Sequence, residues 1–140
     1  MNKLYVREQS LIEIFRYFSF LEKEGYEISD ITYAGRELPS IVYKNKNTKI
    51  RVRVIGSETD YNVVVSRQRF WAFNKRDYVF DVSDYYKYYF CGMIKGKNYT
   101  LKSQADFIQQ NLMPVIKGEI WVNKLLKSLT KNGNNGFKQK

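Results

Sequence analysis

The chain has 140 residues, of which 44% are hydrophobic, a length and composition that suit one globular domain with a single core. Lysine and arginine number 24 against 14 aspartates and glutamates, which gives a formal net charge of +10 and favours polyanions or acidic protein surfaces as partners. Histidine is absent, which removes the commonest general base, the Ser-His and Cys-His nucleophile systems and most catalytic zinc sites. We therefore expect a binding protein, not an enzyme, with no cofactor and no metal.

The first segment predicts an amphipathic helix that ends at Gly25, a residue typical of the position just after a helix. Charged residues lie between apolar residues that recur at three- and four-residue steps, namely Leu4, Leu11, Ile14, Phe15, Phe18 and Leu21.

The charged residues of that segment also bear on the cellular location of the protein. Arg7, Glu8, Glu13 and Arg16 interrupt any apolar core of a signal peptide, and no stretch approaches the ~18 apolar residues of a membrane-spanning helix. The single cysteine, Cys91, has no internal disulfide partner, and its aromatic neighbours favour a buried, inert thiol over a nucleophile. We expect a cytoplasmic protein that does not enter a membrane.

Four short β-rich runs follow the helix. The first two are YEISDITY at 26–33 and SIVYKN at 40–45, and the other two are the arms of the segment TKIRVRVIGSETDYNVVVSRQRFW at 48–71. Glycine, proline and asparagine between the runs indicate short turns. This pattern predicts an antiparallel meander of about four strands, with the first helix packed on one face.

The face on which the four arginines of residues 48–71 lie depends on the pairing register of the two arms. A turn centred on Glu58 gathers Arg51, Arg53, Arg67 and Arg69 on one face together with Lys49, since directly paired residues share a face.

A slip of one residue pairs valine with valine instead, but it turns Arg67 and Arg69 toward the core. Burial of two unpaired guanidinium groups costs several kcal/mol, more than the ~1.5 to 3 kcal/mol gained for each buried valine, unless the strand bends past Val65. We predict the shared basic face, although basic side chains are also ordinary on exposed strands, where they prevent edge-to-edge aggregation.

The C-terminal half predicts helices. Asp81 to Phe90 resemble a short helix or turn with Ser83 as its cap. A helix follows from Ser103, which forms a near capping box with Asp106; Pro114 should kink this helix and Gly118 should end it.

Helical spacing resumes over residues 119–129, whereas residues 131–140 are polar, basic and rich in glycine and asparagine. We expect one α+β domain over residues 1–130, with its C-terminal helices packed on one face of the sheet, and a flexible basic tail at 131–140.

Two other residue groups have alternative interpretations. Asp77, Asp81 and Asp84 have helix-like spacing and would suit a divalent cation, but capping of the short helix accounts for them better, because hard cations recruit more oxygen ligands. The stretch RQRFWAFNKRDYVF at 67–80 mixes cations with rings, as a single-stranded nucleic-acid platform does. It equally fits a strand edge with a core-facing aromatic row.

The order of elements, with IRVRVIGSETDYNVVVSR at 50–67 and FIQQNLMPVIKGEIWVNKLLKSL at 107–129, resembles a broad class of small bacterial proteins that includes immunity proteins of toxin systems. This resemblance implies a protein that blocks one partner by occlusion. Many immunity proteins are acidic, whereas this chain is basic, so we expect an acidic protein partner, with single-stranded nucleic acid as the alternative. The predicted partner-binding residues are Lys49, Arg51, Arg53, Arg67, Arg69, Trp71 and Phe73.

Overall fold

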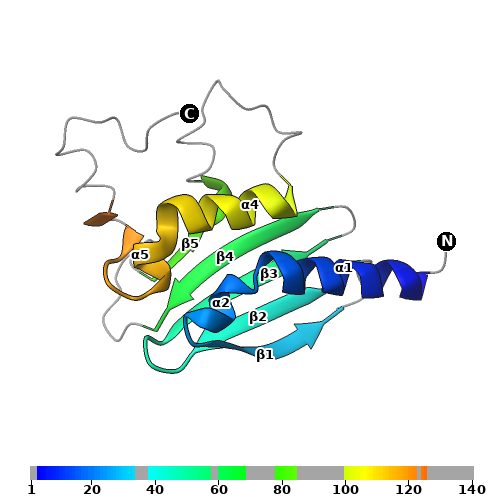
Figure 1. Cartoon of the computed structure of the whole chain (residues 1–140), viewed down its shortest axis with the longest axis horizontal. Helices are drawn as coiled ribbons and strands as arrows, with labels where there is room; N and C mark the ends of the chain where they lie inside the picture. Colours follow the sequence, from blue (N-terminus) through cyan, green and yellow to red (C-terminus); the bar gives the residue numbers. More distant parts are fainter. Residues whose placement is uncertain are drawn as a thin grey trace, which may run out of the picture.

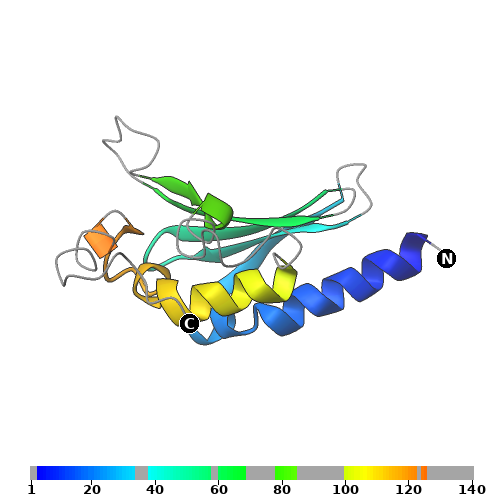
Figure 2. The ribbon, with the colours of Figure 1, turned by 90° about the horizontal axis from the view of Figure 1, so that it is seen from above.

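The computed structural model describes residues 3–33, 38–57, 60–68, 78–84, 100–122 and 124–125. Its helices lie on one side of an antiparallel sheet (Figures 1 and 2), as the α+β prediction required. The sheet has five strands, because a short strand at 79–81 adds to the four expected. In chain order the elements are α1 (Lys3–Tyr17), α2 (Phe20–Lys23), β1 (Tyr26–Thr32), β2 (Ser40–Asn45), β3 (Ile50–Gly56), β4 (Tyr61–Arg67), β5 (Val79–Asp81), α4 (Leu101–Phe107), η3 (Ile108–Leu112) and α5 (Met113–Ile116).

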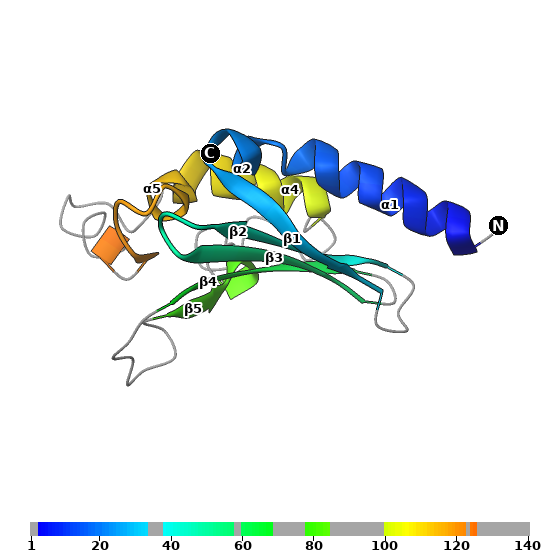
Figure 3. The same cartoon turned by 90° about the horizontal axis from the view of Figure 1, so that it is seen from below.

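The strands form a meander in the order β1-β2-β3-β4-β5, each antiparallel to its neighbour. Side chains alternate between the two faces of each strand, and one row from every strand packs against the helices. Figure 3 shows α1, α2, α4 and α5 above the sheet, and a short helical turn beside β5 at residues 82–84. The core between the layers includes Ile14, Phe18 and Leu21 from the first helices, Tyr43, Val52, Val54, Val63, Val65 and Phe80 from the strands, and Ile108, Leu112 and Ile116 from the last helices.

The first helical segment is two helices, with a break after Tyr17. Gly25 ends the segment as predicted, with a φ of +90° that glycine adopts without strain. Phe15 departs from the expected apolar stripe, because its side chain is 38% exposed. The stripe that faces the sheet is therefore narrower than the sequence indicated.

The helix cap predicted at Ser103 is wrong by three residues, about one turn, since α4 begins at Leu101 after its cap Thr100. Thr100 is the N-cap, and its hydroxyl accepts the Ser103 backbone N–H at 3.1 Å. The Ser103 hydroxyl accepts the Thr100 N–H in return, at 2.7 Å. Ser103 thus occupies the position in this capping box that Glu or Gln usually takes.

The kink predicted at Pro114 takes the form of a π-helical turn, η3, just before it. Proline offers no backbone N–H to the preceding turn, and the wider π spacing is a common way to absorb such a change. The Asn111 side-chain amide donates to the Phe107 carbonyl at 3.3 Å. Gly118, at φ +77°, follows the end of α5, as predicted.

Asn45 joins the β2–β3 turn to the end of the first helical segment. Its side chain is 3% exposed; the amide donates to the Glu24 carbonyl at 2.9 Å, and the oxygen accepts the Asn47 and Thr48 backbone N–H groups at 2.9 and 3.2 Å. One side chain therefore satisfies three backbone groups from two segments.

Replacement of this residue, Asn45→Ala, should lower the free energy of unfolding by about 2 kcal/mol, because it leaves partly buried backbone groups unpaired. Chemical denaturation measures the change. Asn47→Ala is the matched control, since Asn47 lies two residues away in the same turn and is exposed; an equal loss in both variants would contradict the role given to Asn45.

Stability should also fall at alkaline pH. Burial raises the pKa of the Tyr43 hydroxyl to about 12, and the nearby Glu22 carboxylate adds to the rise. The folded chain then keeps this proton while the unfolded chain loses it above pH ~10. The stabilising contribution is complete below pH 10 and is lost as the pH rises toward 12, by about 1.4 kcal/mol per pH unit. Denaturation at several pH values should show a shallower fall for Tyr43→Phe; an unchanged slope would contradict this.

Candidate partner-binding face

The register of β3 and β4 differs from the predicted one by one residue. Val52 pairs with Val65 and Val54 with Val63, and all four valines are fully buried. The turn is centred between residues 58 and 59, and Ser57 N–H donates to the Asp60 carbonyl at 2.9 Å across it. The prediction that all four arginines share one face is therefore wrong: Arg51 and Arg53 point away from the helices, whereas Arg67 pairs with the core residue Ile50.

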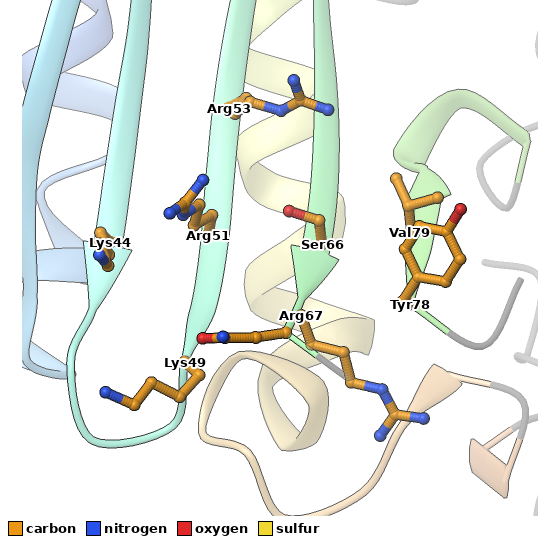
Figure 4. A pocket seen from close by; sticks show the side chains of 9 residues that line it. Lys44, Lys49, Arg51, Arg53, Ser66, Arg67, Tyr78 and Val79 are labelled. Carbon is orange, nitrogen blue, oxygen red and sulfur yellow. The ribbon is translucent and has the colours of Figure 1, made fainter. Parts of the chain in front are cut away.

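Arg67 avoids the burial cost that disfavoured this register in the sequence. It is the last residue of β4, and it leaves the sheet toward the segment after α5, away from Arg51 and Arg53 (Figure 4). Its guanidinium carbon lies 4.3 Å from the centre of the Trp121 ring, a cation–π contact. Trp121 packs edge-on against Phe80 at 5.4 Å. The Arg67 guanidinium group thus covers the Trp121–Phe80 pair at the border of the core.

The helix-free face of the sheet has a basic centre. Reading across the strands, one row of paired residues is Glu27, Lys44, Arg51, Ser66 and Val79, and the next row is Asp30, Val42, Arg53, Val64 and Asp81. With Lys49 at the start of the β3 arm, Lys44, Arg51 and Arg53 form what we call the basic face. Figure 4 shows these side chains on adjacent strands, lining one shallow cavity of about 550 Å³ together with Arg67, Gln68 and Tyr78.

Within the part of the chain that the structure describes, no cation of the basic face forms an ion pair; the pairs seen are Lys46–Glu27 and Lys102–Asp106, although Glu27 also lies opposite Lys44 in the ladder. Lys44 lies directly opposite Arg51, and like charges in directly paired positions destabilise a sheet. The fold therefore tolerates a repulsion here that a bound anion would remove.

Lys49 adds a second local cost. Its φ is +64°, and it is the one non-glycine residue with positive φ among those described. This left-handed conformation disfavours a side chain with a Cβ atom and is usually taken by glycine or asparagine. A lysine in a glycine-like position, beside three other cations, favours a role for its charge.

Of the residues predicted to bind a partner, the structure brings together Lys49, Arg51 and Arg53. Arg67 borders the same cavity, but its guanidinium group turns away from theirs toward Trp121. Arg69, Trp71 and Phe73 lie outside the described residues, as do Cys91 and residues 131–140. Lys44 was missed. It lies on β2, just before the 48–71 segment, and the alternation of SIVYKN already put it on the face opposite Ile41 and Tyr43.

Asp81 has a structural role, as the capping interpretation expected, but it replaces Ser83 as the cap. Its carboxylate accepts the Ser83 N–H at 2.9 Å, the Ser83 hydroxyl at 2.7 Å and the Asn62 amide at 2.6 Å. Asp77 is not among the described residues, and those that are described contain no group of three metal-ligating side chains. None of the helices in the described ranges has the length and apolar character needed to cross a membrane.

Comparison with known proteins found no matching family model, no matching curated protein and no matching solved structure.

Lys49→Ala beside Lys49→Gly separates the strain at Lys49 from its charge, because both variants remove the charge and only glycine also removes the Cβ atom. Lys49→Gly should raise the free energy of unfolding by up to about 1 kcal/mol, because glycine adopts positive φ without a steric cost. Denaturant unfolding of the two proteins measures the difference. Thr48→Gly, next in the chain, is the control and should destabilise the protein; a loss of stability in Lys49→Gly would show that the lysine is not strained.

Proposed function

We propose that this protein is a non-catalytic binding protein whose basic face docks an acidic surface of a protein partner and blocks that partner by occlusion. The observation that carries the proposal is the cluster of Lys44, Lys49, Arg51 and Arg53 on a face that no described helix covers. Opposite charge on the partner would speed association and select the docking register. In the immunity-type interpretation, the partner is a toxin.

The composition of the face favours a protein over single-stranded nucleic acid. Proteins that bind single strands stack bases on aromatic rings. The outward residues of the three central strands include no ring; they are Ser40, Val42 and Lys44 on β2, Arg51, Arg53 and Ile55 on β3, and Asn62, Val64 and Ser66 on β4. Among the residues described near the cavity, Tyr78 is the single ring, at one end.

The residues at the borders of the basic face also favour a protein partner over nucleic acid. Glu27 and Asp30 on β1, and Asp81 on β5, lie at the two ends of the residue rows that cross the sheet. A phosphate backbone that ran across the strands would pass carboxylates at both edges, and these would repel it. A compact acidic projection that meets only β2 and β3 avoids that repulsion.

Charge reversal at the centre tests the proposal. Immobilised Arg51→Glu/Arg53→Glu protein should lose, by at least tenfold, a stoichiometric protein partner that the wild type retains from lysate of the native host. Both residues are exposed, so folding should persist, which circular dichroism checks. The matched control is Lys23→Glu/Lys117→Glu, which changes the net charge equally at exposed positions in the helical layer and should retain the partner.

Each capture is repeated after nuclease treatment. A protein partner that survives digestion, and that the central variant loses while the control keeps it, supports docking through the basic face. Equal loss in both variants would show that only the net charge matters. Material that disappears on digestion would replace the protein partner with nucleic acid, whose binding would fall steeply with added salt.

A further inference from the structure

Strand β1 forms one edge of the sheet, and its outer side has no paired strand among the described elements. Its sequence, YEISDIT, contains no lysine, arginine or proline, residues that commonly protect an edge from pairing with another chain; its protection is limited to Glu27, Asp30 and one bulge. Six of its seven residues are exposed. An exposed edge without a paired strand is a template for another strand.

Apolar side chains gather at this edge. The described part of the chain has five exposed large hydrophobic residues; Ile28 and Ile31 come from β1, Ile12 and Phe15 from α1, and Tyr78 from beside β5 at the opposite edge. Ile28 pairs with Tyr43 and Ile31 with Ile41, so both isoleucines face the helical side of the sheet. They remain 38% and 41% exposed because no described helix extends over them.

A β-bulge is what places both isoleucines on one face. Residues three apart in a regular strand point to opposite faces, but the pairing of β1 with β2 shifts between Ile28 and Asp30. The bulge therefore builds an apolar pair at an edge that regular geometry would have left with one isoleucine on each face. Bulges of this kind re-aim side chains at functional positions.

Helix α1 does not cover the apolar edge at β1. Ser10 and Glu13 are the α1 residues that act on the pKa of the Tyr61 hydroxyl of β4, so this flank of α1 is turned toward the centre of the sheet. Phe15 lies more than a quarter turn of the helix away from both, on the flank turned toward β1. Figure 3 shows β1 at the near edge of the sheet with α1 above it. An added strand would find Phe15 above it and Ile28 and Ile31 beside it.

We infer that the edge of β1 pairs with β1 of a second copy of this chain, antiparallel, to give a symmetric dimer with one continuous sheet. The sequence of β1 is its own complement in the register that sets Ile28 opposite Ile31 of the copy. That register also sets Glu27 opposite Thr32 and Asp30 opposite Ser29. Each carboxylate then meets a hydroxyl group and not another carboxylate, and the bulges coincide about the two-fold axis.

The dimer has a geometric consequence for the basic face. A two-fold axis between antiparallel edge strands is perpendicular to the sheet, so both helix-free faces lie on the same side. The two β3 strands are then separated by five strand spacings, about 24 Å. Two basic faces at this separation would suit a partner that is itself a symmetric dimer, which would bind with higher avidity.

Sedimentation of the full chain, from micromolar to millimolar concentration, tests the inference without any partner. The wild type should reach twice the chain mass of 16.7 kDa, whereas Ile28→Lys/Ile31→Lys should remain at the single mass. Because each copy carries a net charge of +10, added salt should strengthen the dimer by screening repulsion. A wild-type chain that stays at the single mass throughout would overturn the inference.

Tyr78→Lys is the matched control, because Tyr78 is 37% exposed at the other edge of the sheet, and it should dimerise as the wild type does. Arg51→Glu/Arg53→Glu should also dimerise, which separates this edge from the basic face. A folded Ile28→Lys/Ile31→Lys protein that still dimerises would show that the contact lies elsewhere.

Cross-linking tests the register directly and does not depend on the lysine variants folding. In a Cys91→Ser background, a mixture of Ser29→Cys and Asp30→Cys chains should form a disulfide between the two variants in preference to either variant with itself, since these positions face each other across the proposed pair. If each variant cross-linked with itself as readily as with the other variant, the proposed register would be wrong.

Discussion

The pairing of two valines on β3 with two on β4 is the contact on which the arrangement of this protein depends. Val52 and Val54 meet Val65 and Val63 at the centre of the sheet, and all four are fully buried. Because side chains alternate along a strand, the burial of Val52 and Val54 also places Arg51 and Arg53 on the other face. The core and the basic face are two results of the same alternation along β3.

The valine pairing is compatible with Arg67 only because the sheet ends there. Complete burial of an unpaired guanidinium group would cost more than the valines contribute, but Arg67 is half-buried and lies over the face of Trp121. Trp121 comes from a segment more than fifty residues later in the chain. The local sequence pattern allows the burial cost of arginine to be compared with the gain from buried valines. It does not show that the Trp121 ring, from a distant segment, lies against Arg67.

This explains which parts of the structure could be predicted from the sequence. The order of helix and strands, the ends at Gly25 and Gly118 and the outward direction of Arg51 and Arg53 follow from local periodicity and from glycine's access to positive φ. The register of β3 and β4 and the strand at 79–81 depend on contacts between distant segments. The cap at Thr100 was a local feature that the sequence reading placed one turn too late.

The basic face and the β1 edge differ in the kind of recognition that they offer. The first is a cluster of long, charged side chains, which attracts from a distance but loses strength as salt increases. The second is a short run of backbone groups and isoleucines, which acts only at contact and is insensitive to salt or strengthened by it. Both lie on one sheet, with only β2 between β1 and β3. A change in the register of β2 would therefore disturb both surfaces together, whereas substitutions at Ile28 or at Arg53 address each of them alone.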